Sequence, residues 1–156
     1  MPIVPANLSD RMTDILSSHR GLEGPLLPIL HAVQAEWGHV PAEALPIIAQ
    51  DLNITRAEVY GVVTFYHDFR EEPAGRHVVK LCRAEACQAM GADRVAVHAQ
   101  NRLGVGWHGT SAGGITLEPV FCLGLCACAP AALVDGRVEG RVTEARFDAL
   151  MAEVSA

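Results

Sequence analysis

The sequence has few aromatic residues and fewer basic than acidic side chains. Phe, Trp and Tyr make up 5% of its 156 residues while hydrophobic residues make up 50%, so aliphatic side chains and alanine must form most of any core. The formal net charge is −6. With this surplus of carboxylates we expect no nucleic-acid partner, because little remains to neutralise phosphates along a groove. No stretch of about 18 apolar residues occurs, so we expect no membrane-spanning helix.

The first residues also lack the features of a secretion signal. Residues 1–10 contain neither a basic stretch nor an apolar segment of the required kind. We therefore expect a cytoplasmic protein, and thiols stay reduced in that compartment. Disulfides are then a poor explanation for the five cysteines, whose odd number also prevents complete pairing within one chain.

Four of the five cysteines form two close pairs. Cys82 and Cys87 have four residues between them, Cys122 and Cys126 have three, and 34 residues separate the pairs. Brought together by a fold, two such pairs offer four thiolates to a soft metal centre, either zinc or an iron–sulfur cluster. Structural zinc sites usually use shorter spacings, although Cys-x4-Cys also occurs. A [2Fe–2S] cluster spreads its ligands over two irons, which suits two pairs on two loops, and we favour it.

The fifth cysteine, Cys128, is separated from Cys126 by one residue. It could be an alternate ligand or a redox-sensing thiol. We expect a buried residue that is not a ligand, because a buried cysteine usually behaves as a small hydrophobe. The same interpretation, a cysteine that acts only as a small hydrophobe, fits the other four cysteines poorly, because they form two pairs at strand ends.

Residues 1–72 have the pattern of helices. Apolar residues recur at helical spacing over residues 26–37. Pro41 suits the first turn of another helix, and Thr55-Arg56-Ala57-Glu58 has the form of a capping box that begins a third. Pro73-Ala74-Gly75 indicates a linker. The expected apolar faces consist of Leu26, Ile29, Leu30, Val33 and Trp37, then Leu45, Ile48 and Leu52, then Val59, Val62, Val63 and Tyr66.

The second region alternates between strand and helix patterns. Residues 77–81 and 115–121 predict strands that end at the two cysteine pairs, with a helix between them that begins near residue 86 or 90 and ends at Leu103. Residues 132–135 and 140–142 flank Gly136 like a hairpin. Thr143 can cap a last helix with Phe147, Leu150, Met151 and Val154 on one face. The order βαβββα or βαββα predicts an open α/β sandwich of thioredoxin type, with both cysteine pairs at one edge of the sheet.

A cluster at this edge would need help in carrying negative charge. Four thiolates, two sulfides and two ferric ions sum to −2, and reduction by one electron gives −3. Backbone amides directed at sulfur stabilise that charge and raise the reduction potential. We expect these amides from residues 83–86 and 123–125, where Gly124 permits a tight bend and Arg83 adds a cation.

The remaining motifs are weaker. Residues 104–109 match the pattern G-x-G-x-x-G, but a dinucleotide fingerprint follows a strand and opens a helix. This segment follows a predicted helix and runs into a loop. The seven histidines are scattered, and no Ser-His-Asp order or carboxylate pair stands out. We therefore expect no catalytic residue in this chain.

These features together resemble a known family. The cysteine spacing, with Ala129-Pro130 after the second pair, resembles the small thioredoxin-like [2Fe–2S] subunit of NADH dehydrogenases, including respiratory complex I. Residues 61–66 (GVVTFY) resemble the helical region of that subunit, so the resemblance covers nearly the whole chain. Residues 67–70 (HDFR), 80–88 (KLCRAEACQ) and 107–110 (WHGT) resemble, more narrowly, the gamma subunit of soluble NAD-linked formate dehydrogenases that depend on molybdenum or tungsten. Relatives from complex I carry different residues there, and often Asn at the position of Cys128.

The resemblance implies an α/β protein with an N-terminal helical bundle, residues 1–72, followed by a thioredoxin-like [2Fe–2S] ferredoxin domain, residues 77–156. It implies one [2Fe–2S] cluster per chain, with Cys82 and Cys87 on one iron and Cys122 and Cys126 on the other. The two implied partners are a flavoprotein (beta) subunit that binds FMN and NAD, and an alpha subunit whose molybdenum- or tungsten-pterin oxidises formate.

In such a complex this chain would transfer electrons beside the flavin without turnover of its own. Three alternatives remain. The chain could be the equivalent subunit of an NADH dehydrogenase or an NAD-linked hydrogenase, a free thioredoxin-like ferredoxin, or a zinc-stabilised interaction module.

Overall fold

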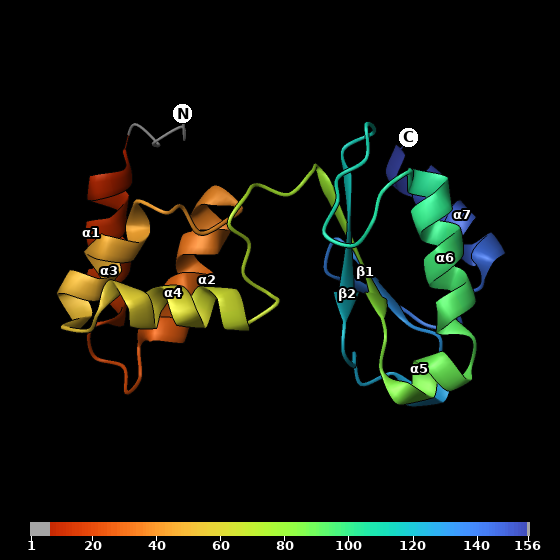
Figure 1. Cartoon of the computed structure of the whole chain (residues 1–156), viewed down its shortest axis with the longest axis horizontal. Coiled ribbons are helices and arrows are strands. Elements are labelled where there is room, and N and C mark those ends of the chain that lie inside the picture. Colours follow the sequence, from red (N-terminus) through yellow and green to blue (C-terminus); the bar gives the residue numbers. More distant parts are fainter. Residues whose placement is uncertain (1–6, 156) are drawn as a thin grey trace. The chain divides into compact units, whose positions relative to one another are not determined.

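The computed structural model describes residues 7–155, which form two compact units that divide between Pro73 and Ala74 (Figure 1). Residues 1–6 and residue 156 lie outside the described residues. The predicted helical region therefore begins outside the described residues. Most of residues 1–10, the segment that lacks the features of a secretion signal, also lies outside them. Over residues 7–155, no helix is both long and apolar enough to cross a bilayer.

The first unit is helical. Its described residues form α1 (Leu8–His19), α2 (Leu26–Trp37), α3 (Ala44–Leu52) and α4 (Arg56–Phe65) (Figure 1). The helix expected over residues 26–37 is confirmed. The capping box is also confirmed, because the Glu58 N–H donates to Thr55 Oγ1 at 3.2 Å and the Thr55 N–H donates to Glu58 Oε2 at 2.8 Å. The fully buried side chains of this core include Met12, Ile29, Leu30, Val33, Ile48 and Val59.

Two expectations about the helical unit are wrong in detail. The helix expected to open at Pro41 begins at Ala44, because the Ala44 N–H bonds the Pro41 carbonyl at 2.9 Å and closes a turn before the helix. Tyr66 was expected on the apolar face of α4, but the helix ends at Phe65 and Tyr66 follows with extended backbone. The Tyr66 side chain is 43% exposed.

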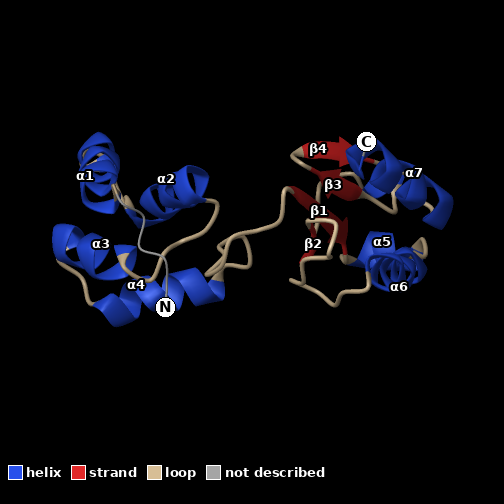
Figure 2. Cartoon of the chain, turned by 90° about the horizontal axis from the view of Figure 1, so that it is seen from above, coloured by secondary structure: helices blue, strands red, loops and turns tan. Residues whose placement is uncertain are grey.

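The second unit is a mixed sheet covered by helices. Its elements are β1 (His77–Cys82), α5 (Glu85–Ala89), α6 (Ala92–Leu103), β2 (Ile115–Val120), the short 3-10 turn Cys126–Cys128, β3 (Ala132–Val134), β4 (Arg137–Glu139) and α7 (Glu144–Ser155). The strand order is β2-β1-β3-β4, with β1 parallel to β2 and the other pairs antiparallel. Figure 2 shows α6 and α7 next to each other on one face of the sheet. The βαβββα order and the α/β fold expected from the sequence are confirmed.

Alternate strand residues build the core of this unit. The register places Val79 of β1 opposite Leu117 of β2 and Val134 of β3, so these three side chains share one face of the sheet. Phe147 and Leu150 of α7 pack against that face and are fully buried. As expected, Thr143 caps α7 by accepting the Arg146 N–H at 3.2 Å. This packing fixes the ends of β1 and β2, where the cysteines lie.

Several boundaries in this unit differ from the expectation. The return strand of the hairpin is β4 at residues 137–139 instead of 140–142, because Asp135 (φ 48°) and Gly136 (φ 83°) form a two-residue turn that reverses the chain at once. Of the two starts expected for the helix that ends at Leu103, the one near residue 90 is confirmed by α6, whereas the start near residue 86 is wrong because Gly91, whose φ is 92°, separates α5 from α6. The second strand ends at Val120, one residue before exposed Phe121.

Candidate metal centre

Both cysteine pairs lie at one edge of the sheet. Cys82 is the last residue of β1 and is paired with Val120, the last residue of β2; Cys122 follows two residues later. Cys87 lies on α5, and Cys126 begins the 3-10 turn. Because parallel strands end at the same edge of a sheet, the fold carries the residues after β1 and β2 to one place.

The thiols are arranged as two pairs. Cys87 is close enough to Cys82 to shift the pKa of the Cys82 thiol, and Cys122 is close enough to Cys126 to shift the pKa of the Cys126 thiol. The charges of Cys82 and Cys126 also interact, so the two pairs are neighbours. In the described part of the chain, no group of three or more Cys, His, Asp or Glu side chains is arranged around a single metal ion. Two adjacent pairs match the needs of two bridged irons, each of which takes two thiolates.

Backbone amides act on the pKa of the Cys82 thiol. Burial raises the pKa of this thiol, but hydrogen bonds from the Ala84 backbone, the Cys87 thiol and the backbone of Cys122 and Leu123 outweigh burial and lower the pKa below its ordinary value. These donors come from both ligand loops, as expected for the segments 83–86 and 123–125. They stabilise a thiolate at this position, which is the form that binds a metal.

The pKa values of two partner thiols shift in the opposite direction. Burial and the hydrogen bond that the Cys87 thiol donates to Cys82 raise the pKa of Cys87, and a hydrogen bond from the Ala131 backbone opposes this rise. The Cys126 pKa is raised by its hydrogen bond to Cys122 and by the charge of that neighbour. Repulsion between close thiolates contributes to both of these raised pKa values, and bound iron would relieve it because iron neutralises their charge.

The loop of the second pair bends tightly around Cys122. Gly124 has a φ of 75°, which glycine adopts without strain, and its N–H donates to Cys122 Sγ at 3.4 Å. Cys122 itself has a φ of 100°, an uncommon backbone conformation for a residue with a side chain. The bend expected at Gly124 is therefore present, and it directs an amide at sulfur.

The two pairs differ in exposure. Cys82 and Cys87 are each 2% exposed, whereas Cys122 and Cys126 are exposed at the surface. The inner pair belongs to a separate small apolar cluster that is rich in alanine: Ala84, Ala92, Val120, Leu123, Leu125, Ala129 and Ala131. This cluster excludes water from one side of the site and leaves the other side open.

Cys128 has different surroundings. It is partly buried, and its carbonyl accepts the Arg141 N–H at 2.6 Å. A Cβ added to Gly140 would lie 2.8 Å from the Cys128 Cβ, so the two residues are closely packed. The cysteines named among the leading causes of the shifted pKa values of Cys82, Cys87 and Cys126 are all members of the two pairs.

Sequence reasoning missed two features of the site. Ala131 supplies an amide to Cys87, and no sequence pattern marks an alanine beyond the second pair as a donor. Arg83 was expected as a nearby cation, but its contacts with Asp93 and Trp107 were not. Both features depend on which distant segments the fold brings together. The sulfur donors in two pairs, with amides directed at them, fit a [2Fe–2S] cluster.

Comparison with known proteins places the chain in a family. Residues 12–155 match the family described as thioredoxin-like [2Fe-2S] ferredoxin. The chain is 33% identical to the HndA subunit of the NADP-reducing hydrogenase of Solidesulfovibrio fructosivorans, over 97% of this chain and 89% of that protein. It is 40% identical to a subunit of the NADH-quinone oxidoreductase of Pseudomonas aeruginosa, over 72% of this chain and 69% of that protein.

A solved structure has the same fold. The NAD+-reducing [NiFe]-hydrogenase in its H2-reduced state superimposes with a TM-score of 0.69 and 25% identity over 83% of this chain. The match spans only 22% of that hydrogenase chain, so there the fold is part of a much larger polypeptide.

The relatives named here favour one of the alternatives stated for the sequence. They are subunits of hydrogenases and of an NADH-quinone oxidoreductase, whereas membership of a formate dehydrogenase stays a prediction. The family match extends over both units and over every paired cysteine. This chain belongs to the thioredoxin-like [2Fe–2S] ferredoxin family, and its cofactor is a [2Fe–2S] cluster.

Proposed function

We propose that this chain is the electron-transfer subunit of a multisubunit NAD-linked oxidoreductase, of the NADH dehydrogenase or NAD-reducing hydrogenase type. We propose Cys82, Cys87, Cys122 and Cys126 as the ligands of its cluster. The observation that carries this proposal is that the two cysteine pairs lie next to each other at one edge of the sheet. Backbone amides are directed at their sulfurs. The cluster, when bound, accepts and donates one electron at a time.

The protein's own residues give the site an inner and an outer side. Cys82 and Cys87 hold the inner side in an alanine-rich environment that excludes water. Cys122 and Cys126 hold the outer side at the surface. Exposed Phe121, at 63%, and Met90, at 62%, lie next to these loops in sequence and add apolar surface. A partner's redox centre would therefore approach the outer pair.

We propose that the helical unit docks the subunit that carries the flavin and the NAD site. Exposed aromatic side chains of this unit support the docking role. Tyr60, Phe65 and Tyr66 on and after α4 are 48%, 72% and 43% exposed, which is unusual in a chain with few aromatics. Exposed apolar groups that cluster in this way mark contact surfaces.

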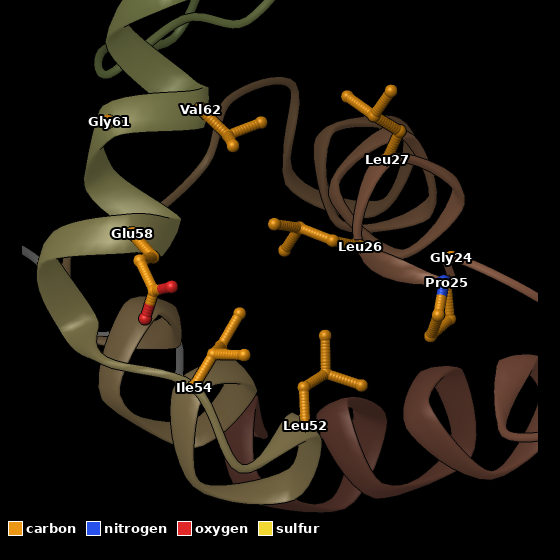
Figure 3. Close-up of a pocket in the computed structure, with 9 residues that line it drawn as sticks. All are labelled: Gly24, Pro25, Leu26, Leu27, Leu52, Ile54, Glu58, Gly61 and Val62. Carbon is orange, nitrogen blue, oxygen red and sulfur yellow. The ribbon is translucent and has the colours of Figure 1, made fainter.

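An apolar groove lies next to these residues on the same helix. Its volume is about 610 Å³, and Figure 3 shows Leu26, Ile54 and Val62 pointing into a common space. Glu58 supplies the one carboxylate among the side chains drawn there. The lining residues come from α2 and the turn before it, from the end of α3 and the loop after it, and from α4: Gly24, Pro25, Leu26, Leu27, Leu52, Ile54, Glu58, Gly61 and Val62. This lining suits an apolar segment of the flavin subunit.

The next question is which substrate donates the electrons in this assembly. The relatives support an NADH dehydrogenase or hydrogenase assembly. The segments 67–70, 80–88 and 107–110 support a formate dehydrogenase with a molybdenum- or tungsten-pterin subunit as second partner. The complex purified through a tag on this chain should therefore be assayed with formate, with H2 and with a quinone. NADH formation from formate would select the formate dehydrogenase assignment.

The isolated chain tests the electron-transfer proposal. Iron and acid-labile sulfide should each approach two per chain, and the protein reduced with dithionite should give a rhombic S = 1/2 EPR signal. It should not reduce NAD+, since hydride transfer moves two electrons together and one cluster accepts one. Addition of the flavin subunit and the substrate-oxidising subunit should restore NADH formation. Stoichiometric zinc without the EPR signal would refute the proposal, as would NAD+ reduction by the chain alone.

A further inference from the structure

Arg83 is fixed between the two ligand loops. It follows Cys82 directly, and its N–H donates to the carbonyl of Val120 at 2.7 Å, two residues before Cys122. Its carbonyl accepts the Gln88 side-chain amide at 2.6 Å, which ties it to the α5 segment that carries Cys87. The backbone of Arg83 therefore joins the segments that carry both cysteine pairs.

The guanidinium of Arg83 is fixed as well. Nη2 donates to Asp93 Oδ1 at 2.9 Å, and Cζ lies 5.3 Å from the centre of the Trp107 ring, a cation–π distance. The Arg83 side chain is 29% exposed, and that of Asp93 is 59% exposed. An ion pair and an aromatic face thus hold a mostly buried cation on the residue that follows Cys82 in the chain.

One donor of this guanidinium has no acceptor among the described residues. Within residues 7–155, Nε of Arg83 is buried and lacks a hydrogen-bond partner. Native proteins leave few buried donors unpaired, and a bound group often explains those that remain. The sulfide and thiolate sulfurs of a [2Fe–2S] cluster are acceptors of the required kind.

We propose that Arg83 raises the reduction potential of the cluster, through its positive charge and its free Nε–H. The inference rests on the proposed ligand set. Reduction takes the cluster from −2 to −3, so a nearby cation stabilises the reduced form more than the oxidised form. Asp93 opposes this effect only in part, because its carboxylate is twice as exposed and is better screened by water and salt.

The test is an EPR-monitored redox titration of the cluster-loaded full chain. Arg83→Gln should favour the oxidised form on the order of tenfold at a fixed potential, which is about 59 mV for a one-electron couple. Arg83→Lys keeps the charge but loses Nε, so its potential should lie between those of Arg83→Gln and the native chain. Asp93→Asn should raise the potential because it removes the opposing charge.

Arg102→Gln is the matched control. Arg102 is an exposed arginine near the other end of α6, and it is also paired with an aspartate, Asp148, at 3.6 Å. Its removal changes the net charge by the same amount and should leave the potential unchanged. The proposal is overturned if Arg83→Gln and Arg102→Gln, both with full iron content, have the same reduction potential.

Iron content separates the possible failures. If Arg83→Gln does not take up the cluster, the reduction potential of Asp93→Asn tests the role of Arg83 instead. That variant keeps every proposed ligand and Arg83 itself. An unchanged potential in Asp93→Asn then overturns the inference, and a raised one supports it. Native chain without iron contradicts the ligand assignment, whereas loaded variants with unshifted potentials contradict the role of Arg83 alone.

Discussion

Cys126 and Cys128 are separated by one residue but differ in chemical surroundings. Cys126 is hydrogen-bonded to Cys122 and interacts with the charge of Cys82, whereas the Cβ of Cys128 packs beside Gly140. Cys128→Ala removes only the sulfur and keeps this packing, so the variant should retain iron and sulfide at two per chain. Cys126→Ala should lose most of its iron. Equal iron loss in the two variants would show that the proposed ligand set is wrong.

Asp135 predicts a pH dependence of stability. Burial raises its pKa, but hydrogen bonds from His77 Nδ1 at 2.7 Å and the Val78 N–H at 2.8 Å outweigh burial and hold the pKa below its ordinary value of 3.8. A carboxyl with a lowered pKa stabilises the fold above its ordinary value and loses that contribution as the pH falls through the folded value. The side chain is 42% exposed, so after solvent screening the contribution is about 0.5–1 kcal/mol.

Asp135→Asn isolates this contribution. Asparagine tolerates the positive φ of the turn and keeps an oxygen for the Val78 N–H, but it carries no charge. Urea unfolding should show the native protein to be more stable than the variant at pH 6, and the difference should disappear near pH 2. A difference of the same size at both pH values would mean that ionisation of Asp135 contributes nothing.

The proposed ligands could be selected from the sequence, but their environment could not. Cysteine spacing and the strand pattern before Cys82 and Cys122 indicate where thiols gather, because both signals are local. The Ala131 amide at Cys87 and the Trp107 ring at Arg83 come from segments more than 20 residues away in the chain. No local rule identifies such contacts, since they arise only when the sheet and helices pack.

At the scale of elements, turn chemistry explains where the expected boundaries moved. Gly136 correctly marks the hairpin, but a two-residue Asp-Gly turn brings β4 forward to residues 137–139. Gly91, with a φ of 92°, separates α5, which carries Cys87, from α6, so the helix that ends at Leu103 starts near the later of the two expected positions. Each residue is visible in the sequence, yet the backbone conformation that it adopts depends on the surrounding fold.

The loop after β4 must approach the 3-10 turn closely. An alanine Cβ at Gly140 would lie 2.8 Å from the Cys128 Cβ and 3.1 Å from the Cys128 carbonyl oxygen. Gly140→Ala should therefore displace the turn that begins with Cys126, destabilise the fold by about 1–3 kcal/mol and reduce iron content. Thermal unfolding and iron analysis measure both effects.

Gly113→Ala is the control for that variant. Its added Cβ would meet only the Ser111 hydroxyl at 3.8 Å, an ordinary contact, and Gly113 does not have a positive φ. It should retain native stability and iron content. If Gly140→Ala behaves like Gly113→Ala, the close packing of Cys128 against Gly140 does not constrain the ligand loop.

At the scale of the whole molecule, each unit has its own buried core. The helical unit encloses side chains such as Ile29, Ile48 and Val59, and the second unit encloses Val79, Leu117 and others between sheet and helices. The proposed ligands all belong to the second unit. The sequence indicated one region with helical patterns and a second in which strand and helix patterns alternate. It could not identify the exposed aromatics of α4, because exposure depends on how the helices pack.

This separation predicts what truncation does. A chain that lacks residues 1–73 keeps the sheet, α5, α6, α7 and all of the paired cysteines, so it should fold and retain the absorption and EPR signal of the cluster. It should no longer copurify with the flavin subunit, because Tyr60, Phe65 and the groove beside Val62 are absent.

A point variant separates loss of docking from loss of folding. Phe65→Ser removes the most exposed of these aromatics, at 72%, and leaves the buried core of the helical unit intact. Its unfolding temperature and iron content should equal those of the native protein. A pull-down with this variant should nevertheless recover less of the flavin subunit. The variant Val97→Ser changes an apolar residue of similar exposure, 57%, on α6 and should bind normally. Copurification of the truncated chain at the native level would show that docking relies on the cluster unit alone, and the proposed role of the helices would then be wrong.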